Sequence, residues 1–372
     1  MEEVNIMMKP VSGNCNMRCS YCFYMDEMQN REIRFPAKMS LQTLEQIVKR
    51  VQETGVKKCN FAFQGGEPTL VGLAFFEKFI SYVKKYLYDR QVSFSIQTNG
   101  YNLTDEWMRF LKYNDFLVGV SVDGVRATHD CNRKDTNQRG TYERVMQNID
   151  RLKEAKIPFN VLTVVNAKTA AKIRRIYESY KKNQFRYQQY IICLDPLDSD
   201  EKNSSYSLTN EAYGQFLCDL FDLWYLDLQK GEQPYIRQFE SYISIFFGMY
   251  PDACEQRGVC SCQIVIESDG SVYPCDFYVL DNYSIGNVTD EGFTYEKLPE
   301  KAKEFIAPSV AVDEECRHCK YYILCRNGCR RMRSFEERRY GKNIFCEAYQ
   351  RFFDYAGERL YQIADTLRKT KS

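Results

Sequence analysis

The 372-residue sequence has few histidines, no excess of charge of either sign and no long apolar run. Its only histidines are His129 and His318, which excludes a metal site built mainly from imidazole. Basic and acidic residues nearly balance, 51 against 50, so the charge demands neither nucleic acid nor a membrane surface as partner. Residues 1–10 lack the pattern of a secretory signal, and no stretch is apolar enough to span a bilayer. We therefore expect a cytoplasmic protein.

Cysteine is the residue in which the chain is rich, with sixteen copies. Because cytosolic thiols stay reduced, this number predicts metal or cluster ligation rather than a disulfide framework. Four cysteines lie on strand or helix patterns and are expected to pack in the core: Cys59, Cys131, Cys193 and Cys218. The others fall into two groups, one at each end of the chain.

Short apolar runs alternate with amphipathic helical patterns over the first half of the chain. Six runs are predicted to be buried parallel strands: Val4–Lys9, Cys59–Gln64, Val92–Thr98, Phe116–Val122, Phe159–Val165 and Tyr187–Leu194. Six β–α units favour an α/β fold in the form of an open, partial (βα)6 TIM-like barrel, with a doubly wound sheet as the alternative. In either fold the chemistry is expected at the carboxyl ends of the strands.

The β–α rhythm stops after the sixth strand, and an apolar helix is predicted at Glu211–Leu228. We predict a barrel domain over residues 1–230, with a core at about 1–200 and this helix as a bridge. Residues 231–346 are rich in cysteine and turn residues, which predicts a second domain stabilised by bound metal. A C-terminal helix is expected at 347–372.

The first cysteine group is the C-x3-C-x2-C loop of Cys15, Cys19 and Cys22. A [4Fe-4S] cluster normally takes four thiolates, so three leave one iron open to chelate the amino acid end of S-adenosylmethionine. Zinc would favour C-x2-C pairs with four ligands in total. The loop resembles the signature of the radical S-adenosylmethionine superfamily. The Gly-Gly turn in Gln64–Pro68 resembles that superfamily's cofactor-binding motif, because glycine lets the backbone approach a ligand closely.

Eight cysteines near the carboxyl end suit two further four-cysteine clusters, with a pair of zinc ribbons as the competing interpretation. Their order of spacings resembles the SPASM domain of radical enzymes that modify peptides. The resemblance implies one auxiliary cluster on Cys254, Cys260, Cys275 and Cys329, and a second on Cys316, Cys319, Cys325 and Cys346. Spacing alone does not establish this partition, and Cys262 can replace Cys260.

Several segments together resemble the anaerobic sulfatase-maturating enzymes: Cys15–Tyr24, Phe61–Pro68, Gln97–Gly100, Asn132–Asp135 and Ser268–Asp281. The resemblance implies oxidation of a cysteine or serine in an unfolded sulfatase segment to Cα-formylglycine. It further implies three [4Fe-4S] clusters, S-adenosylmethionine, a Cys-x-Pro-x-Arg peptide as partner and an external low-potential electron donor.

The same resemblance assigns roles to individual residues. Asp276 matches the family's base. Matching positions for S-adenosylmethionine are Tyr21, Gly66, Ser121, Arg133 and Leu194, and those for the peptide are Tyr24, Gln64 and Arg237. Two alternatives stay open: a SPASM-type maturase that forms a thioether, crosslink or epimer in a ribosomal peptide, and a metal-binding scaffold without catalysis.

Overall fold

Strands and helices alternate along the chain in the order that the apolar pattern predicts. The computed structural model describes residues 2–32, 37–197, 206–251, 253–336 and 339–371. Chain contacts divide it into two units, which are described separately. Unit 1 comprises Met1–Ser121, Asp130–Phe159 and Ser261–Phe305, and unit 2 comprises Val122–His129, Asn160–Cys260 and Ile306–Ser372.

Unit 1 contains the first four predicted strands, each within two residues of its expected bounds. Its main elements are β1 (Glu3–Met8), α1 (Phe23–Gln29), α2 (Leu41–Glu53), β2 (Lys58–Phe63), α3 (Leu73–Tyr86), β3 (Gln91–Thr98), α4 (Asp105–Tyr113), β4 (Leu117–Ser121), α6 (Tyr142–Glu154), β8 (Ile264–Ile266), β9 (Ser271–Tyr273), β10 (Gly286–Asn287) and α11 (Leu298–Lys301). Helices α5 (Arg126–Asn132) and α12 (Lys303–Val310) contain residues of both units, and strand β5 (Phe159–Val165) has its first residue in unit 1 and the rest in unit 2.

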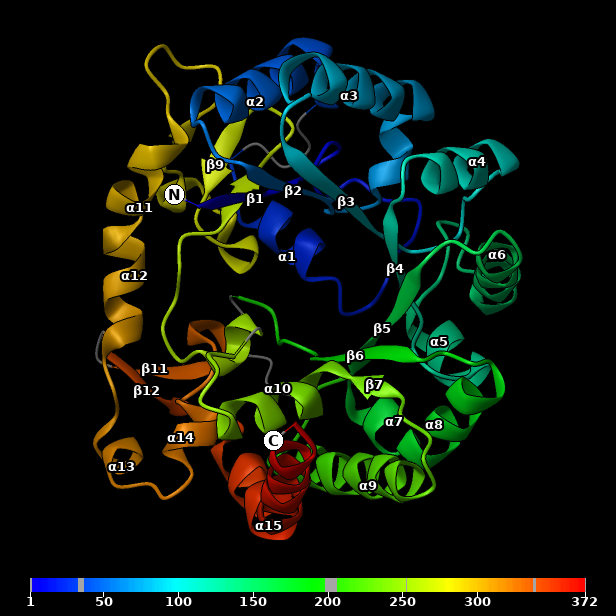
Figure 1. Ribbon diagram of the computed structural model, residues 1–372, viewed down its shortest axis with the longest axis vertical. Helices are drawn as coiled ribbons and strands as arrows, with labels where there is room; N and C mark the ends of the chain where they lie inside the picture. Colours follow the sequence, from blue (N-terminus) through cyan, green and yellow to red (C-terminus); the bar gives the residue numbers. More distant parts are fainter. Residues whose placement is uncertain (1, 33–36, 198–205, 252, 337–338, 372) are drawn as a thin grey trace. The chain divides into compact units, whose positions relative to one another are not determined.

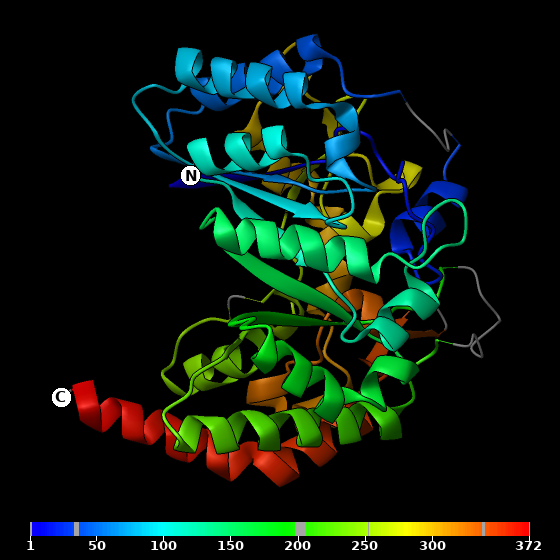
Figure 2. The same cartoon turned by 90° about the vertical axis from the view of Figure 1, so that its right-hand side faces the viewer.

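Strands β1 to β4 pair in parallel and in chain order, with β1 beside β2, β2 beside β3 and β3 beside β4. Helices α2 and α3 lie side by side over one face of these strands (Figures 1 and 2). Phe63 of β2 and Phe76 and Phe79 of α3 are fully buried, with ring centroids 4.6 and 5.0 Å from Phe63. This aromatic layer fills the space between sheet and helices, and burial of such rings is a large part of the fold's stability.

Three short strands from the cysteine-rich part extend the same sheet. β8 runs parallel to β1, β9 pairs antiparallel with β8, and β10 pairs antiparallel with β9, so unit 1 has the order β10-β9-β8-β1-β2-β3-β4. Gly270 turns the β8–β9 connection at a φ of +88°, a left-handed conformation that favours glycine. The sequence pattern does not predict the pairing of β8 with β1. This pairing places Asp276, which follows β9, near the sheet.

Unit 2 contains the last two predicted strands and the C-terminal helix. Its main elements are β5 (Phe159–Val165), α7 (Ala167–Ala170), α8 (Ile173–Lys182), β6 (Tyr187–Ile192), α9 (Asn210–Gln229), β7 (Tyr235–Ile236), α10 (Arg237–Phe246), α13 (Glu314–Arg317), α14 (Tyr322–Cys325), β11 (Arg333–Glu336), β12 (Arg339–Asn343) and α15 (Cys346–Lys371). β5, β6 and β7 pair in parallel, and β11 pairs antiparallel with β12.

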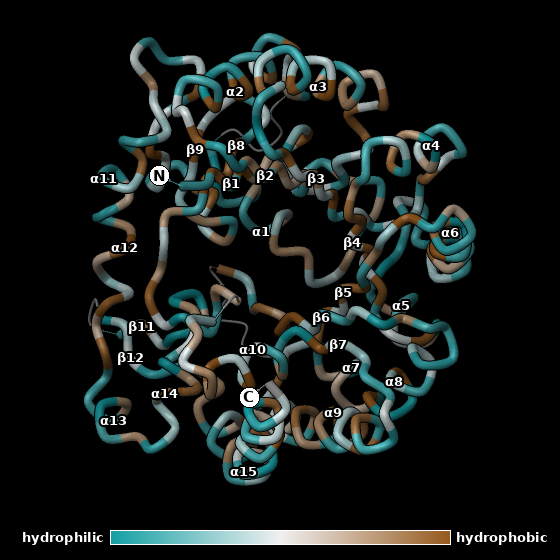
Figure 3. The backbone as a smooth tube through the Cα atoms, viewed as in Figure 1, coloured by the Kyte–Doolittle hydropathy of each residue, from teal (hydrophilic) through white to brown (hydrophobic). Residues whose placement is uncertain are grey.

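The helices show the amphipathic pattern that the sequence predicts. Helix α6 carries both hydrophilic and hydrophobic stretches (Figure 3), and its buried residues include Val145, Ile149 and Leu152. Helices α9 and α15 pack side by side through buried aromatic rings such as Phe221 and Phe352, whose centroids are 5.9 Å apart. An α/β fold with parallel strands is therefore confirmed. No helix in the described part of the chain combines the length and hydropathy needed to cross a membrane.

Candidate active site

The first cysteine loop follows β1 in unit 1 and ends at Cys22, the residue that precedes helix α1. Backbone N–H groups of Arg18 and Ser20 donate to the carbonyls of Lys134 and Asn132, at 2.8 and 3.1 Å. These bonds fix the loop against the segment that carries Arg133.

Arg133 and Tyr21, both predicted to contact S-adenosylmethionine, lie together beside this loop. Arg133 Nη1 donates to the Tyr21 hydroxyl at 3.0 Å. Ser121, at the end of β4 in the same unit, accepts from Gln97 Nε2 at 3.1 Å. The role of each residue in cofactor binding stays a prediction.

The three cysteines of this loop are half-buried, and Cys15 and Cys22 lie close enough to influence each other. Burial, with smaller contributions from Glu67 and Cys22, raises the pKa of Cys15 to about 11, and burial also raises the pKa of Cys22. Two donors nevertheless point at Cys15 Sγ: Met17 N–H at 3.3 Å and Asn99 Nδ2 at 3.5 Å. These thiols resist ionisation on their own, but the N–H groups would stabilise a thiolate. Bound iron would supply the positive charge that offsets the charge of the sulfurs, so the loop suits thiolate ligation to iron.

The Gly65–Gly66 turn packs directly against the backbone that leads into the cysteine loop. Gly66 N–H donates to Ser12 O at 2.7 Å, and a Cβ on Gly66 would lie 2.0 Å from Asn14 O. Gly65 has a φ of +106°, so it needs glycine for a second reason. The glycines thus have a structural role in addition to the cofactor contact predicted for Gly66.

Glu67 is a site residue that the sequence analysis did not single out. Its fully buried carboxylate accepts hydrogen bonds from Thr98 Oγ1 at 2.9 Å and from Asn99 N–H at 2.8 Å. It also accepts from Thr69 Oγ1 at 2.7 Å. Glu67 therefore joins the turn after β2 to the end of β3. The sequence feature that could have identified Glu67 is an acidic residue directly after a buried strand and a Gly-Gly turn.

A second group of polar residues gathers at the carboxyl end of β1. Asp276 begins a short 3-10 turn at Asp276–Tyr278, and the Tyr24 hydroxyl donates to Asp276 Oδ2 at 2.9 Å. The same hydroxyl is 3.3 Å from Gln64 Oε1. The structure thus brings together the predicted base and two of the predicted peptide-contacting residues.

Lys9 completes this group and was not expected from the sequence. Its Nζ lies 2.9 Å from Asp276 Oδ1, 3.5 Å from Glu27 Oε2 and 4.5 Å from the centroid of the Tyr24 ring. Burial alone would lower the pKa of Lys9, but the carboxylates of Asp276, Glu27 and Glu267 raise it above its ordinary value. Lys9 is therefore a buried cation at the centre of an acidic group.

The two remaining predicted contact residues of the site belong to unit 2. Leu194 follows β6, and Arg237 is the first residue of α10. Their roles stay predictions, because the other residues predicted to contact S-adenosylmethionine or the peptide belong to unit 1.

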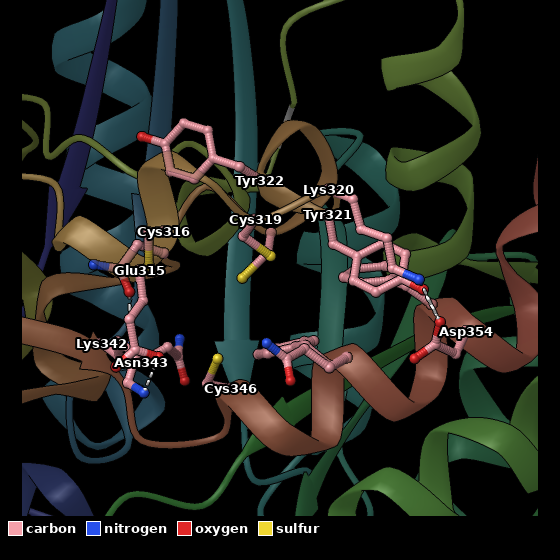
Figure 4. Close-up of a pocket in the computed structure, with 15 residues that line it drawn as sticks. Glu315, Cys316, Cys319, Lys320, Tyr321, Tyr322, Lys342, Asn343, Cys346 and Asp354 are labelled. Atoms are coloured by element: carbon pink, nitrogen blue, oxygen red, sulfur yellow. Dashed lines mark hydrogen bonds and ion pairs between the residues drawn. The ribbon is translucent and has the colours of Figure 1, made fainter.

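The four cysteines predicted for the second auxiliary cluster line one cavity of about 310 Å³ in unit 2. Figure 4 shows the thiols of Cys319 and Cys346 pointing into the same space, with Cys316 beside them. Cys325 completes the set. Across the described ranges of the chain, no three acidic, histidine or cysteine side chains converge closely enough to hold one metal ion. Thiols arranged around a cavity fit a multi-iron cluster better than a single zinc.

Three of the four cysteines predicted for the first auxiliary cluster lie together in unit 2. Burial raises the pKa of Cys329 to about 12, and Cys254 and Cys260 add to the shift as nearby thiols. The fourth, Cys275, belongs to unit 1. For Cys262, burial is the one cause that raises the thiol pKa, to about 11.

Known proteins resemble this chain along its whole length. Residues 10–179 match the Radical SAM superfamily, and residues 254–320 match SPASM, an iron-sulfur cluster-binding domain. A cysteine-type anaerobic sulfatase-maturating enzyme of Clostridium novyi is 45% identical over 99% of both chains. A serine-type enzyme of Bacteroides thetaiotaomicron is 28% identical over 94% of this chain and 88% of its own.

A solved structure supports the same comparison. It is described as native anSMEcpe with bound AdoMet and Cp18Cys peptide. It is 41% identical, covers 98% of this chain and 99% of its own, and superposes with a TM-score of 0.93.

Replacing Gly66 with alanine should disrupt the first cysteine loop. The new Cβ has to displace the backbone at Asn14, so we expect a loss of at least about 2 kcal/mol in the free energy of unfolding. Iron content should fall at the same time. The measurements are anaerobic thermal unfolding and iron analysis.

The matched control is Gly357→Ala in helix α15, where no atom beyond the helix's own adjacent backbone lies within 4 Å of the added Cβ. Alanine should stabilise that helix by about 0.5–1 kcal/mol. Equal stability and iron content in the Gly66 variant and the control would show that the Gly65–Gly66 turn does not need glycine at position 66.

Glu27 should make stability depend on pH. Burial raises the pKa of Glu27 from 4.5 to about 8, so between these values the folded protein holds a proton that the unfolded chain has released. The stabilisation is complete below pH 4.5 and is lost as the pH rises through 8. Glu27→Gln should therefore flatten the fall in melting temperature between pH 4.5 and about 8.

Glu53→Gln, an exposed position on α2, is the control for loss of an acidic group and should leave the pH profile unchanged. Parallel profiles for the wild type and Glu27→Gln would show that Glu27 does not hold the proton.

Proposed function

This chain belongs to the cysteine-type anaerobic sulfatase-maturating enzymes of the radical S-adenosylmethionine superfamily, and we propose that it oxidises a cysteine in an unfolded sulfatase segment to Cα-formylglycine. The resemblance noted in the sequence is confirmed. The protein is an oxidoreductase that uses S-adenosylmethionine and [4Fe-4S] clusters. The observation that carries the proposal is the convergence of Tyr24, Gln64 and Asp276 at the end of β1.

The reaction balances as the loss of one hydrogen atom, one proton and one electron. When bound, S-adenosylmethionine and the cluster at Cys15, Cys19 and Cys22 supply the 5′-deoxyadenosyl radical that removes the hydrogen atom from Cβ. Removal of the thiol proton by a base, with the electron passing to a cluster that the auxiliary cysteines would hold, would then convert the substrate's methylene thiol to a thioaldehyde. Water replaces the sulfur, which releases hydrogen sulfide and leaves the aldehyde.

Asp276 is the group placed to take the thiol proton. The Tyr24 hydroxyl donates to Asp276 Oδ2, and Lys9 Nζ forms an ion pair with the buried Oδ1. A carboxylate oxygen has about two lone pairs, so Oδ2 retains one for the substrate. Its side chain is 15% exposed, whereas that of Lys9 is 1% exposed and that of Glu27 is 5% exposed. Within this group, Asp276 is therefore the carboxylate that a peptide can reach.

The remaining residues orient the base. Lys9 holds one oxygen of Asp276 and the Tyr24 hydroxyl holds the other, so the carboxylate plane has little freedom to rotate. Gln64 Oε1 lies 3.3 Å from the Tyr24 hydroxyl, and its amide can pair with a peptide backbone. A base held in one orientation lowers the entropic cost of reaching the reactive geometry.

We further propose a Cys-x-Pro-x-Arg segment as the substrate and an external low-potential electron donor as the partner. The solved relative described with a bound Cp18Cys peptide supports a peptide substrate. Sixteen cysteines that need reducing conditions support a cytoplasmic location. Three [4Fe-4S] clusters would use the two auxiliary cysteine sets as well as the first loop.

The reduced, reconstituted protein should convert the cysteine of a Cys-x-Pro-x-Arg peptide to an aldehyde. The assay combines S-adenosylmethionine with the peptide and detects the aldehyde by hydrazone trapping and mass spectrometry. A Ser-x-Pro-x-Arg peptide tests substrate preference, and an Ala-x-Pro-x-Arg peptide is the blank. Cleavage of S-adenosylmethionine with a thioether, crosslink or epimer as the product would favour the alternative maturase function.

Asp276→Asn should slow peptide oxidation by about 10²-fold or more, because an amide cannot accept the thiol proton but keeps the size of the side chain. The assembled first cluster should be retained. Asp269→Asn, in the exposed turn of the same β8–β9 hairpin, is the matched control and should react at the wild-type rate. A normal turnover rate in Asp276→Asn would remove this residue from the mechanism.

A further inference from the structure

Arg333, the first residue of β11, is a buried cation in unit 2 whose partners are backbone carbonyls. Its side chain donates to Asn327 O at 3.1 Å, to Ser309 O at 2.8 Å and to Gly328 O at 3.0 Å. It also donates to Gly258 O. The residue is 6% exposed, and within the described ranges no carboxylate forms an ion pair with it. A buried guanidinium without a carboxylate is costly, so another negative charge is expected nearby.

The carbonyls that hold Arg333 belong to the segments that carry the auxiliary cysteines. Gly258 lies two residues before Cys260, and Asn327 and Gly328 lie between Cys325 and Cys329. Ser309, whose carbonyl accepts from Arg333, also accepts the Cys260 N–H through its Oγ at 2.9 Å. One side chain thus joins three separate segments of the cysteine-rich part.

Cysteine thiols, which become thiolates when they bind iron, are the groups near Arg333 that can carry negative charge. Burial lowers the pKa of Arg333, while Cys260, Cys329 and Cys316 act in the opposite direction as nearby anions. Cys260 and Cys329 belong to the set predicted for the first auxiliary cluster, and Cys316 to the set predicted for the second. The guanidinium is therefore within electrostatic reach of cysteines from both sets.

We propose that Arg333 is a positioning residue whose buried positive charge raises the reduction potentials of the iron-sulfur clusters held by these auxiliary cysteines. A cluster with four thiolates is anionic, and reduction adds one more negative charge. A fixed cation in a region of low dielectric stabilises the reduced form more than the oxidised form. The effect of Arg333 on the potentials does not depend on the proposed function. The inference rests on that function only in the role of the clusters, which is to accept the electron that peptide oxidation releases.

The test measures the potentials directly and does not depend on peptide turnover. Full-length protein with Cys15, Cys19 and Cys22 replaced by alanine retains only the auxiliary sites, whose reduction is followed by electron paramagnetic resonance in a redox titration. In this background, Arg333→Gln removes the charge, and Arg333→Lys keeps the charge but loses the planar fork. Arg339→Gln, an exposed position on the paired strand β12, controls for loss of a positive charge that solvent screens.

We expect Arg333→Gln to lower the auxiliary potentials, so that at the wild-type midpoint the ratio of reduced to oxidised clusters falls about threefold or more. Arg333→Lys and Arg339→Gln should keep that ratio. If Arg333→Gln fails to hold iron while Arg333→Lys holds it with wild-type potentials, the requirement for charge is again supported.

Two results would overturn the proposal. Unchanged potentials in an iron-loaded Arg333→Gln protein would show that the charge has no effect on the clusters. Loss of auxiliary iron in both Arg333 variants would show that the guanidinium acts only as an anchor for the three segments. Neither result depends on whether the intact protein makes formylglycine, so failure of this inference is distinguishable from failure of the proposed function.

Discussion

The pairing of β1 with its two neighbours is the constraint on which the site depends. On one side, Gln64 N–H donates to Met8 O at 2.9 Å, which sets the start of the Gly65–Gly66 turn. On the other side, Lys9 N–H donates to Ile266 O at 2.8 Å, which sets the position of β8. The cysteine loop continues directly from β1. A six-residue strand therefore aligns three segments that lie far apart in the sequence, and a shift of one residue would turn its side chains to the opposite face.

Buried charge is the second constraint, and the two units meet it with different cations. In unit 1, the ammonium of Lys9 forms an ion pair with Asp276 and lies 3.5 Å from the carboxyl group of Glu27, so one compact charge contacts two carboxyl groups. In unit 2, the guanidinium of Arg333 spreads its donors over carbonyls from three segments. This division follows from geometry, because a planar fork with five donors can hold more backbone groups at once than an ammonium with three.

The sequence predicted the parts of the fold and the site that depend on local pattern. Apolar runs located all six predicted strands, because the sequence of a buried parallel strand is a continuous hydrophobic segment. Val164 of β5 and its partner Ile191 of β6, for example, come from two such runs. The pairing of β8 with β1 could not be predicted, because three residues carry too little pattern to specify a distant partner. Lys9 and Arg333 were missed for a related reason: a lysine or arginine is normally exposed, and only the tertiary fold shows that these two are buried.

The chemistry of the site fits a thiol better than a hydroxyl as the group that loses a proton. A carboxylate is a weak base, and an ordinary cysteine thiol titrates near pH 8.5, several units below an alcohol. Proton transfer to Asp276 is therefore less unfavourable from cysteine than from serine. Its neighbours do not offer a stronger base, since Lys9 is held as a cation and the pKa of the buried Tyr24 hydroxyl is raised well above its ordinary value, chiefly by burial. A site with this one accessible carboxylate is thus matched to cysteine oxidation, whereas serine requires either a stronger base or a more acidic radical before the proton can leave.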